Sequence, residues 1–426
     1  MALEHLDLRG KADQLDELLA RPVIIDAALS DAVSEIIASV RRNGDAALKE
    51  LTERFDGVVV GEVALAPGEA AGALARIGGP LREALQVAHR RIVAHHERDE
   101  APCGETITEG VRIVDLVRPL ARAGCYVPGG LARYPSSVLM CATPAKVAGV
   151  GEVAVCVPPA PDGSVDDVTL AAAAIAGVDE IYRVGGAQAV AALAYGTESI
   201  KAVDIIAGPG NRYVTEAMRQ VSGVVKVPSA MAGPSEVLVV ADEHTPAALA
   251  AIDLAVQAEH GPDGLSWLVS WSEAKIQEID RELDRIVASS PRRSALEATL
   301  KAGGYACLVQ GPEEAIAVSN VVAPEHLELM VQGADELLAL VDNAGAIFLG
   351  ASTPAALGDY LAGPNHVLPT NRTARFSSVL STRDFRRYMH AIQAGPGSLR
   401  ALGPHVITLA FAEGLDAHAR SVEMRL

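Results

Sequence analysis

Hydrophobic residues recur at helical spacing through the first hundred positions of the chain. Between residues 27 and 51 the apolar side chains fall three and four positions apart, which predicts a helix with one buried face. Ser30 and Asp31 are candidate caps for this helix. Residues 80–98 repeat the spacing, so the first hundred residues are predicted to be mainly helical.

From about residue 111 the pattern changes, and short apolar runs alternate with helical stretches. Alternation of this kind is typical of α/β units with largely parallel sheets, so an α/β fold is predicted. Eight runs are predicted to be strands: 111–116, 153–157, 180–184, 203–206, 237–240, 266–270, 306–309 and 346–349.

Glycine and proline cluster at residues 127–130, 208–210 and 233–234, and the first and last clusters are candidate domain boundaries. The predicted organisation follows from them. It has an N-terminal arm (1–20), a discontinuous first α/β domain (21–125 and 235–380), an inserted α/β domain (126–234) and a C-terminal tail (381–426).

Composition and net charge indicate what the core is made of and which partners are not expected. Half of the residues are hydrophobic but only 4% are aromatic, so the core must consist largely of Ala, Val, Leu and Ile, which suits buried parallel strands. The balance of 36 basic and 54 acidic residues gives a formal charge of −18, which repels phosphate backbones and anionic lipid. Neither nucleic acid nor a membrane is expected as a partner. No apolar leader or bilayer-length run occurs, and a cytoplasmic protein is expected.

Two glycine turns each follow a predicted strand and open a predicted helix, at residues 184–189 and 207–211. Glycine lets a ligand approach the backbone, and a helix N-terminus offers free N–H groups to phosphate. Neither turn matches G-x-G-x-x-G, and a purely structural role is the commoner one for a single glycine turn. Two such turns in one α/β segment favour nucleotide binding.

Two polar pairs are candidates for chemistry. Gln257 and His260 lie three apart at the end of a helical run, so they share a face; capping of the helix end is the alternative. Glu325 and His326 are adjacent, and a carboxylate beside an imidazole can transfer protons near neutral pH. The alternative for them is a surface glutamate and a histidine at a helix start.

Further candidates follow in the C-terminal third. Asp359 and His366 lie in a segment rich in Gly, Pro and Asn, and Glu413 and His418 lie near the end of the chain. The five cysteines are odd in number and lack C-x-x-C spacing, which argues against disulfides and against a thiolate zinc site. Nitrogen and oxygen ligands that would suit zinc are available if they converge: Gln257, His260, Asp359 and His418.

Several long stretches of the chain resemble the histidinol dehydrogenase family, in the family's order and over nearly the whole length. They include GCYVPGGLARYPSSVLM, VGGAQAVAALAYGTESI, AGPGNRYVTEAMRQV, QAEHGPD, APEHLEL, GDYLAGPNHVLPT and EGLDAHARSVEMR. The resemblance implies a zinc-dependent oxidation of L-histidinol through bound L-histidinaldehyde to L-histidine, with two NAD and one Zn²⁺ per subunit. It also implies two Rossmann-like domains with an incomplete nucleotide-binding fingerprint, 126–234 binding NAD, in an interwoven homodimer.

The resemblance assigns roles residue by residue. The metal ligands correspond to Gln257, His260, Asp359 and His418, and the catalytic pair corresponds to Glu325 and His326. Substrate positions correspond to the four ligands, His326, Ser136, Ser235, His366 and Glu413, and positions near NAD to Tyr126, Gln188 and Asn211. In the family each site takes its C-terminal histidine and glutamate from the partner chain, which implies the same for His418 and Glu413.

The chain departs from the family pattern at residues 228–231, which read Pro-Ser-Ala-Met where relatives carry an Ile-Asp-Met type of stretch. The change alters the loop that leads to Ser235, so a dehydrogenase of another small alcohol is a second interpretation. A non-catalytic nucleotide- or metal-binding protein is a third. His366, Glu413 and Ser235 favour histidinol over the second, and the Glu325–His326 pair beside a ligand set disfavours the third.

Overall fold

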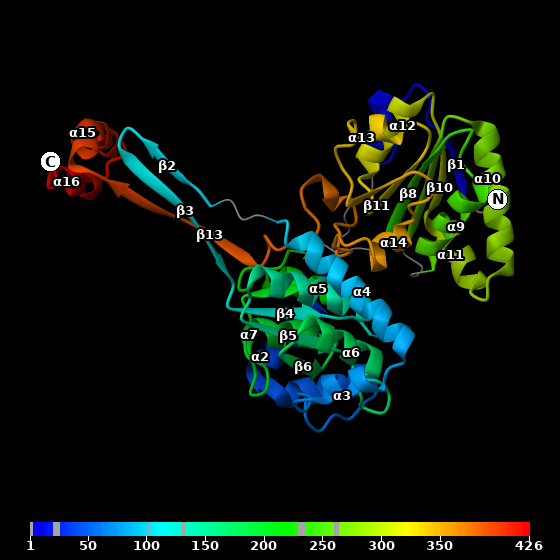
Figure 1. Ribbon diagram of the computed structural model, residues 1–426, viewed down its shortest axis with the longest axis horizontal. Coiled ribbons are helices and arrows are strands. Elements are labelled where there is room, and N and C mark those ends of the chain that lie inside the picture. Colours follow the sequence, from blue (N-terminus) through cyan, green and yellow to red (C-terminus); the bar gives the residue numbers. More distant parts are fainter. Residues whose placement is uncertain (1–2, 20–25, 100–102, 130–132, 229–234, 260–263) are drawn as a thin grey trace.

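The chain folds into two α/β lobes and a long arm that projects from them (Figure 1). The computed structural model describes residues 3–19, 26–99, 103–129, 133–228, 235–259 and 264–426. Both lobes are built on parallel sheets, so the α/β prediction is confirmed. No helix in these ranges is long and apolar enough to cross a membrane.

The first lobe contains a six-stranded sheet in which every neighbouring pair is parallel. Alternate residues of its central strand enter different cores, Val237 and Val239 on one face and Leu238 and Val240 on the other. Burial on both faces explains the continuous apolar runs in the sequence. The strand order is β1 (Glu4–Asp7), β10 (Gly304–Leu308), β9 (Leu265–Ser270), β8 (Glu236–Ala241), β11 (His326–Met330), β12 (Ala346–Leu349).

Helices cover both faces of this sheet. One core contains residues of α9 (Ala247–Ala258), α10 (Glu273–Ser289) and α11 (Arg293–Gly303). The other contains residues of α1 (Leu15–Leu18), α12 (Pro312–Val322) and α13 (Ala334–Leu338). Further short elements of the lobe are α14 (Ala355–Tyr360) and the 3₁₀ turns at Ala12–Gln14 and Thr373–Arg375.

The second lobe contains a four-stranded parallel sheet in the order β6 (Glu180–Arg183), β5 (Glu152–Val157), β4 (Arg122–Tyr126), β7 (Ile205–Ala207). One face packs on α3 (Glu69–Arg76), α4 (Gly79–His96), α5 (Pro135–Ala148) and α6 (Asp167–Ala176). The other packs on α2 (Ala27–Asp56), α7 (Gly186–Tyr195) and α8 (Arg212–Val221).

This packing differs from the expected domain division in two respects. Helices α2, α3 and α4 cover the sheet of the second lobe, whereas residues 21–125 were expected to join residues 235–380. Residues 4–7 were expected to belong to an arm but form a strand that pairs with β10. The reason is that an apolar helix face can cover any nearby sheet, and position along the chain does not say which.

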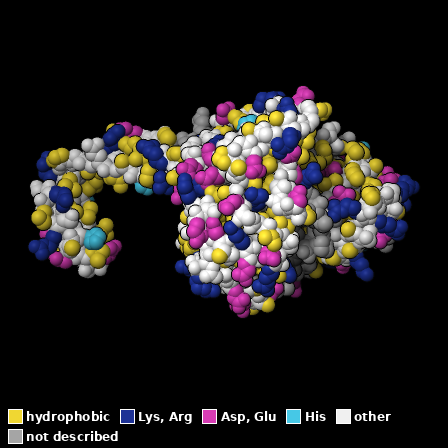
Figure 2. All heavy atoms as spheres, turned by 90° about the horizontal axis from the view of Figure 1, so that it is seen from below, with side chains coloured by type: hydrophobic (Ala, Val, Ile, Leu, Met, Phe, Trp, Pro, Cys, Tyr) yellow, Lys and Arg dark blue, Asp and Glu magenta, His cyan; other side chains and the backbone are white. Residues whose placement is uncertain are grey.

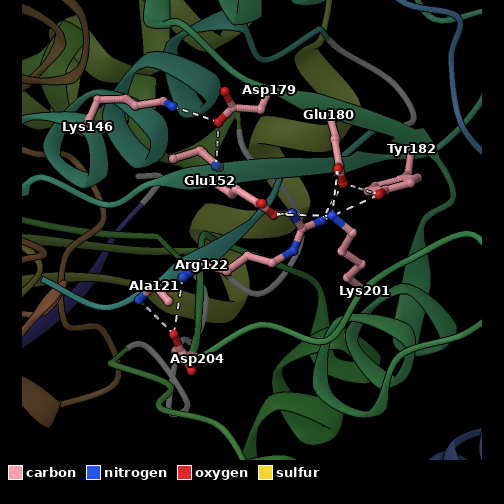
Figure 3. Close-up of polar contacts among 10 residues, drawn as sticks. Ala121, Arg122, Lys146, Glu152, Asp179, Glu180, Tyr182, Lys201 and Asp204 are labelled. Carbon is pink, nitrogen blue, oxygen red and sulfur yellow. Dashed lines mark hydrogen bonds and ion pairs between the residues drawn. The ribbon is translucent and has the colours of Figure 1, made fainter.

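The buried Arg122 links the amino ends of β4, β5 and β6 in the second sheet (Figure 3). The Arg122 guanidinium, at the start of β4, contacts the carboxylates of Glu152 on the adjacent strand β5 and of Glu180 on β6, the strand beyond it. Lys201 adds a second positive charge nearby. Partial burial tends to raise the pKa of Glu180, but hydrogen bonds from Arg122 and Tyr182 hold it below its usual value. This charged cluster therefore links the ends of three strands.

The arm is an antiparallel ribbon that ends in two helices. Strands β2 (Glu105–Thr108), β3 (Val111–Pro119) and β13 (Arg386–Ala394) form the ribbon, and α15 (Pro396–Ala412) and α16 (Asp416–Glu423) lie at its far end, away from both lobes (Figure 1). Large apolar side chains lie exposed along it (Figure 2). They include Ile107, Ile392, Leu409, Phe411 and Met424. A surface of this kind is typical of a protein–protein interface.

All eight predicted strands occur, although residues 111–116 belong to the arm and not to a parallel sheet. The described chain has five more strands that were not predicted: β1, β2, β4, β11 and β13. The most consequential omission is β11, whose sequence HLELM carries a histidine and a glutamate in a fully buried strand. Charged residues are rarely buried, so the run did not resemble a core strand.

Candidate active site

The candidate site lies at the amino edge of the six-stranded sheet. His326 opens β11, in register with Val237 of β8 and Ala346 of β12. Helices α9 and α14 each follow a strand and run back to this edge, where they bring Gln257 and Asp359 to the histidine. Ligands of open α/β sheets usually bind at the carboxyl edge, so this site is built at the opposite end.

His326 begins a buried strand and the buried Glu325 immediately precedes it, so the alternative of a surface glutamate and a helix-start histidine is wrong. The backbone N–H of Glu236 donates to Glu325 Oε2 at 2.9 Å. His326 Nδ1 lies 3.0 Å from the carbonyl oxygen of Glu236, and its Nε2 lies 3.4 Å from Asp359 Oδ1. Backbone and carboxylate contacts at both ring nitrogens therefore fix the imidazole.

Two carboxylates make the surroundings of His326 negative. Burial by itself lowers the pKa of His326, but the carboxylates of Glu325 and Asp359 outweigh it and raise that pKa well above its usual value. The same carboxylates that attract a proton would attract a metal cation. Helices α9 and α14 also end here, and the C-terminal end of a helix carries partial negative charge.

Part of the expected metal-ligand set converges in this chain. Gln257 is buried, and its Oε1 has no hydrogen-bond partner, which is costly unless a cation or donor binds there. Asp359 adds a carboxylate oxygen, and oxygen donors of these types suit a divalent ion. His260 lies outside the described residues, and within the described ranges no three His, Cys, Asp or Glu side chains form a ready metal cluster.

The fourth expected ligand is remote. His418 lies on α16 and Glu413 caps the end of α15, so both are exposed at the far end of the arm (Figure 1). The structure therefore does not bring these two residues to the site of their own chain.

Close packing sets the position of Asp359. An added Cβ at Gly358 would lie 2.6 Å from Cε1 of Phe348, so only glycine lets α14 approach β12 this closely. The Phe348 ring lies beside the His326 ring, with 5.9 Å between their centroids. The helix, the phenyl ring and the imidazole thus form one packed stack.

His366 joins the two lobes at the site. Its Nδ1 lies 2.9 Å from the carbonyl oxygen of Asp359, and its Nε2 lies 3.5 Å from Oγ of Ser137 on α5. Burial lowers the pKa of His366, which favours the neutral ring. The resemblance implied Ser136, which lies half-buried on the same first turn, whereas Ser137 makes this contact and was not predicted. Ser235 immediately precedes β8, at the same edge of the sheet as His326.

The expected NAD residues lie at the carboxyl edge of the other sheet. Tyr126 ends β4, and its Oη accepts a hydrogen bond from the Gly186 N–H at 3.2 Å, while burial raises the pKa of Tyr126 to about 12. Gly208 has φ +135, and an added Cβ would lie 2.0 Å from the carbonyl oxygen of Tyr126. Gln188 is buried with no partner for its Oε1. The two glycine turns therefore meet at this edge, where α/β folds bind nucleotides.

Asn211 has a structural role that the sequence did not reveal. Its Oδ1 accepts hydrogen bonds from the N–H groups of Tyr213 and Val214, at 3.0 and 3.1 Å, and so caps α8. Capping alone accounts for an asparagine at this position.

Comparison with known proteins decides the family. The family model described as histidinol dehydrogenase matches residues 19–426. A histidinol dehydrogenase from Aromatoleum aromaticum is 47% identical over 431 residues, which cover 100% of this chain and 98% of that protein. The chain belongs to the histidinol dehydrogenase family. The enzyme from Pseudomonas aeruginosa is likewise 47% identical, over 97% of this chain and 94% of its own length.

Solved structures agree with this membership. The crystal structure of histidinol dehydrogenase from Elizabethkingia anophelis superimposes with a TM-score of 0.94 at 32% identity, covering 100% of this chain and 98% of that one. An acetylating aldehyde dehydrogenase from Geobacillus thermoglucosidasius has a TM-score of 0.50 at 14% identity, which is a likeness of fold alone. As a histidinol dehydrogenase family member, the chain is an oxidoreductase, as the resemblance predicted.

Proposed function

We propose that this protein oxidises L-histidinol through L-histidinaldehyde to L-histidine, the last steps of histidine biosynthesis, with two NAD and one zinc ion per subunit. The observation that carries the proposal is the convergence of Gln257, Asp359 and the Glu325–His326 pair at one negative edge of the first lobe. Family membership supplies the substrate class.

Gln257 and Asp359 would hold the zinc ion together with His260 and with His418 of a second subunit. Such an ion would supply a template that orients the nitrogen-bearing substrate. The unsatisfied Gln257 Oε1 and the two helix C-termini at this edge support a cation here.

A cation held beside Asp359 would offset the carboxylate charge that raises the pKa of His326. The neutral ring would then remove the hydroxyl proton during the first hydride transfer to NAD, and Glu325 would activate water to hydrate the aldehyde. His326 would assist the second hydride transfer. Backbone contacts hold both side chains in place, so little reorganisation accompanies each proton transfer. Ser136, Ser235 and His366 are proposed to orient the substrate.

NAD would bind at the carboxyl edge of the second sheet, near Tyr126, Gln188 and Asn211. Strand β7 returns to the side of β4 opposite β5, so the strand order reverses there, and open α/β sheets usually bind ligands at such a point. We therefore propose a Rossmann-like arrangement for both lobes, with an incomplete glycine fingerprint.

A homodimer with exchanged arms would complete each site. The arm carries exposed apolar side chains that a monomer would leave in water, and it holds Glu413 and His418 far from the site of their own chain (Figures 1 and 2). Both features are accounted for if the arm lies against a second subunit and delivers its histidine and glutamate there.

Counting NADH per histidine tests the function. Zinc-loaded protein with L-histidinol should form about two NADH per histidine, since a four-electron oxidation needs two hydride acceptors. Chelation should abolish the reaction and zinc should restore it. Folded, zinc-containing protein that forms no NADH would redirect the search to other small alcohols and to the loop at residues 228–231.

The division of labour has its own test. Glu325→Gln should keep oxidation of histidinol to the aldehyde but slow oxidation of added histidinaldehyde, because only the second step needs activated water. Equal losses in both steps would contradict separate roles for the two residues.

A further inference from the structure

Two buried carboxyl groups lie directly behind the candidate site, and the proposed chemistry uses neither. Asp253 lies on α9, four residues before Gln257, and Glu328 lies on β11, two residues after His326. Their exposed fractions are only 9% and 1%. Residues four apart on a helix share a face, as do residues two apart on a strand. The pair therefore lies on the faces that carry the glutamine and the histidine.

Glu328 also holds the helix that carries Asp359. Its Oε1 accepts a hydrogen bond of 2.9 Å from the backbone N–H of Ala355, the first residue of α14. The first N–H groups of a helix have no partner within the helix, so this contact satisfies one of them. Asp359 follows four residues later on the same face. Glu328 thus fixes the start of a short helix whose end reaches the site.

The remaining carboxyl oxygens require a proton. Glu328 Oε2 is buried with no N–H or O–H donor, and the carboxyl of Asp253 is the group that faces it. Two ionised carboxylates would repel each other, and neither could donate. Burial, and then the charge of Asp253, raises the pKa of Glu328 to about 8, and burial also raises the pKa of Asp253. One proton held between them removes a charge and supplies the missing donor.

We propose that Asp253 and Glu328 share one proton and form a clamp that holds α9, β11 and α14 in register at the metal site. The clamp is a positioning device, because it reaches the proposed ligands only through the elements that carry them. This inference rests on the proposed zinc site.

Two substitutions at one position separate a working clamp from a broken one. In Glu328→Gln the amide can donate to Asp253 and accept from Ala355, so zinc affinity should stay within about threefold of wild type. Glu328→Leu removes both contacts and leaves the carboxylate of Asp253 buried without this partner. Zinc affinity should then fall about 10- to 100-fold, as for other groups that orient metal ligands. Affinity is measured on the full-length protein by competition with a chromophoric chelator.

A second readout needs no metal. Hydrogen exchange of the amides of α14 in the zinc-free protein should quicken in Glu328→Leu and stay slow in Glu328→Gln, because only the leucine loses the acceptor for Ala355. Asp280→Ala is the matched control. Asp280 is a buried carboxylate on α10 of the same lobe, 3.4 Å from His5 Nε2, so its loss should lower the melting temperature without changing zinc affinity.

The outcomes separate the clamp from the function it serves. If wild type binds no zinc, the proposed zinc site fails and the clamp fails with it. If wild type binds zinc and Glu328→Leu binds it equally well, the clamp alone is refuted. Glu328→Gln as weak as the leucine variant would show that an ionised carboxylate is needed, which also refutes a shared proton. Should the leucine variant not fold, Asp253→Ala, which removes the partner, takes its place.

Discussion

Replacement of Gly358 by alanine should displace the proposed ligand Asp359 by a predictable amount. The added Cβ would meet Cε1 of Phe348 at 2.6 Å and Cζ at 2.7 Å, whereas carbon atoms in good contact lie about 3.5 to 4.0 Å apart. Relief of the clash requires a movement of about 1 Å, the difference between these distances. Either α14 moves away from β12, or the phenyl ring, which lies beside the His326 ring, is displaced.

Both movements damage the site. A misplacement of about 1 Å can cost about 100-fold in rate, so turnover with L-histidinol should fall by about 10- to 100-fold. Overpacking of this kind typically costs about 1–3 kcal/mol in the free energy of unfolding. Without a clash, alanine in a helix would instead stabilise by about 0.5–1 kcal/mol. Turnover is measured by NADH formation, and stability by urea unfolding.

A control and a rescue make the reasoning refutable. Gly79 is the first residue of α4 and has nothing within 4 Å of an added Cβ, so Gly79→Ala should leave turnover unchanged. Adding Phe348→Leu to Gly358→Ala shortens the opposing side chain and should recover part of the lost rate. Full activity in Gly358→Ala, or no recovery in the double variant, would refute the steric argument.

Three further predictions concern the arm, the proposed NAD site and the charged cluster around Arg122. Mixing inactive His418→Ala and Asp359→Ala proteins under conditions that let subunits exchange should restore about a quarter of wild-type activity. Half of the dimers are then mixed, and each mixed dimer has both changes in one site and leaves the other site intact. No recovery would contradict a site shared between subunits. Asn211→Ala should cost about 1 kcal/mol through the lost cap, whereas Asn211→Asp should keep the stability and raise the KM for NAD, and an unchanged KM would leave Asn211 as a cap alone. The folded pKa of Glu180 lies below its ordinary value of 4.5, so the ionised side chain stabilises the fold above pH 4.5, and this stabilisation is lost as the pH falls through the folded pKa. The difference in unfolding midpoint between wild type and Glu180→Gln should therefore be full at neutral pH and vanish in acid. A difference in midpoint that persists at low pH would refute an ionic contribution.

Much of the fold could be predicted from local pattern alone. The strands of both parallel sheets that are long and apolar were found because burial on two faces leaves continuous runs of Val, Ile, Leu and Ala. Strand β4 was missed because its five residues, RAGCY, include an arginine and a glycine. Its arginine can be buried because β5 and β6 supply carboxylates, and such long-range compensation leaves no local signal.

The candidate site was less accessible to sequence reasoning. The sequence predicted that Gln257 lies on the last turn of a helix, as it does in α9. Its approach to His326 depends on how two crossovers return to one edge, which local spacing does not show. The buried state of Glu325 and His326 depends on β8 and β12 on either side of β11. Ser137 carried no signal at all, since it differs from Ser136 only in which way the first turn of α5 faces.

The return of helices to the amino edge makes this site unusually dependent on helix length. Helix α9 has 12 residues, and the position of Gln257 is set by the number of them that separate it from β8. Deleting one residue would rotate the glutamine by about 100° and draw it back by about 1.5 Å, which removes it from His326 while leaving the apolar face largely able to repack. Insertions and deletions should therefore be tolerated in the turns at the carboxyl edge of this sheet, and should abolish activity within α9 even where the variant still folds.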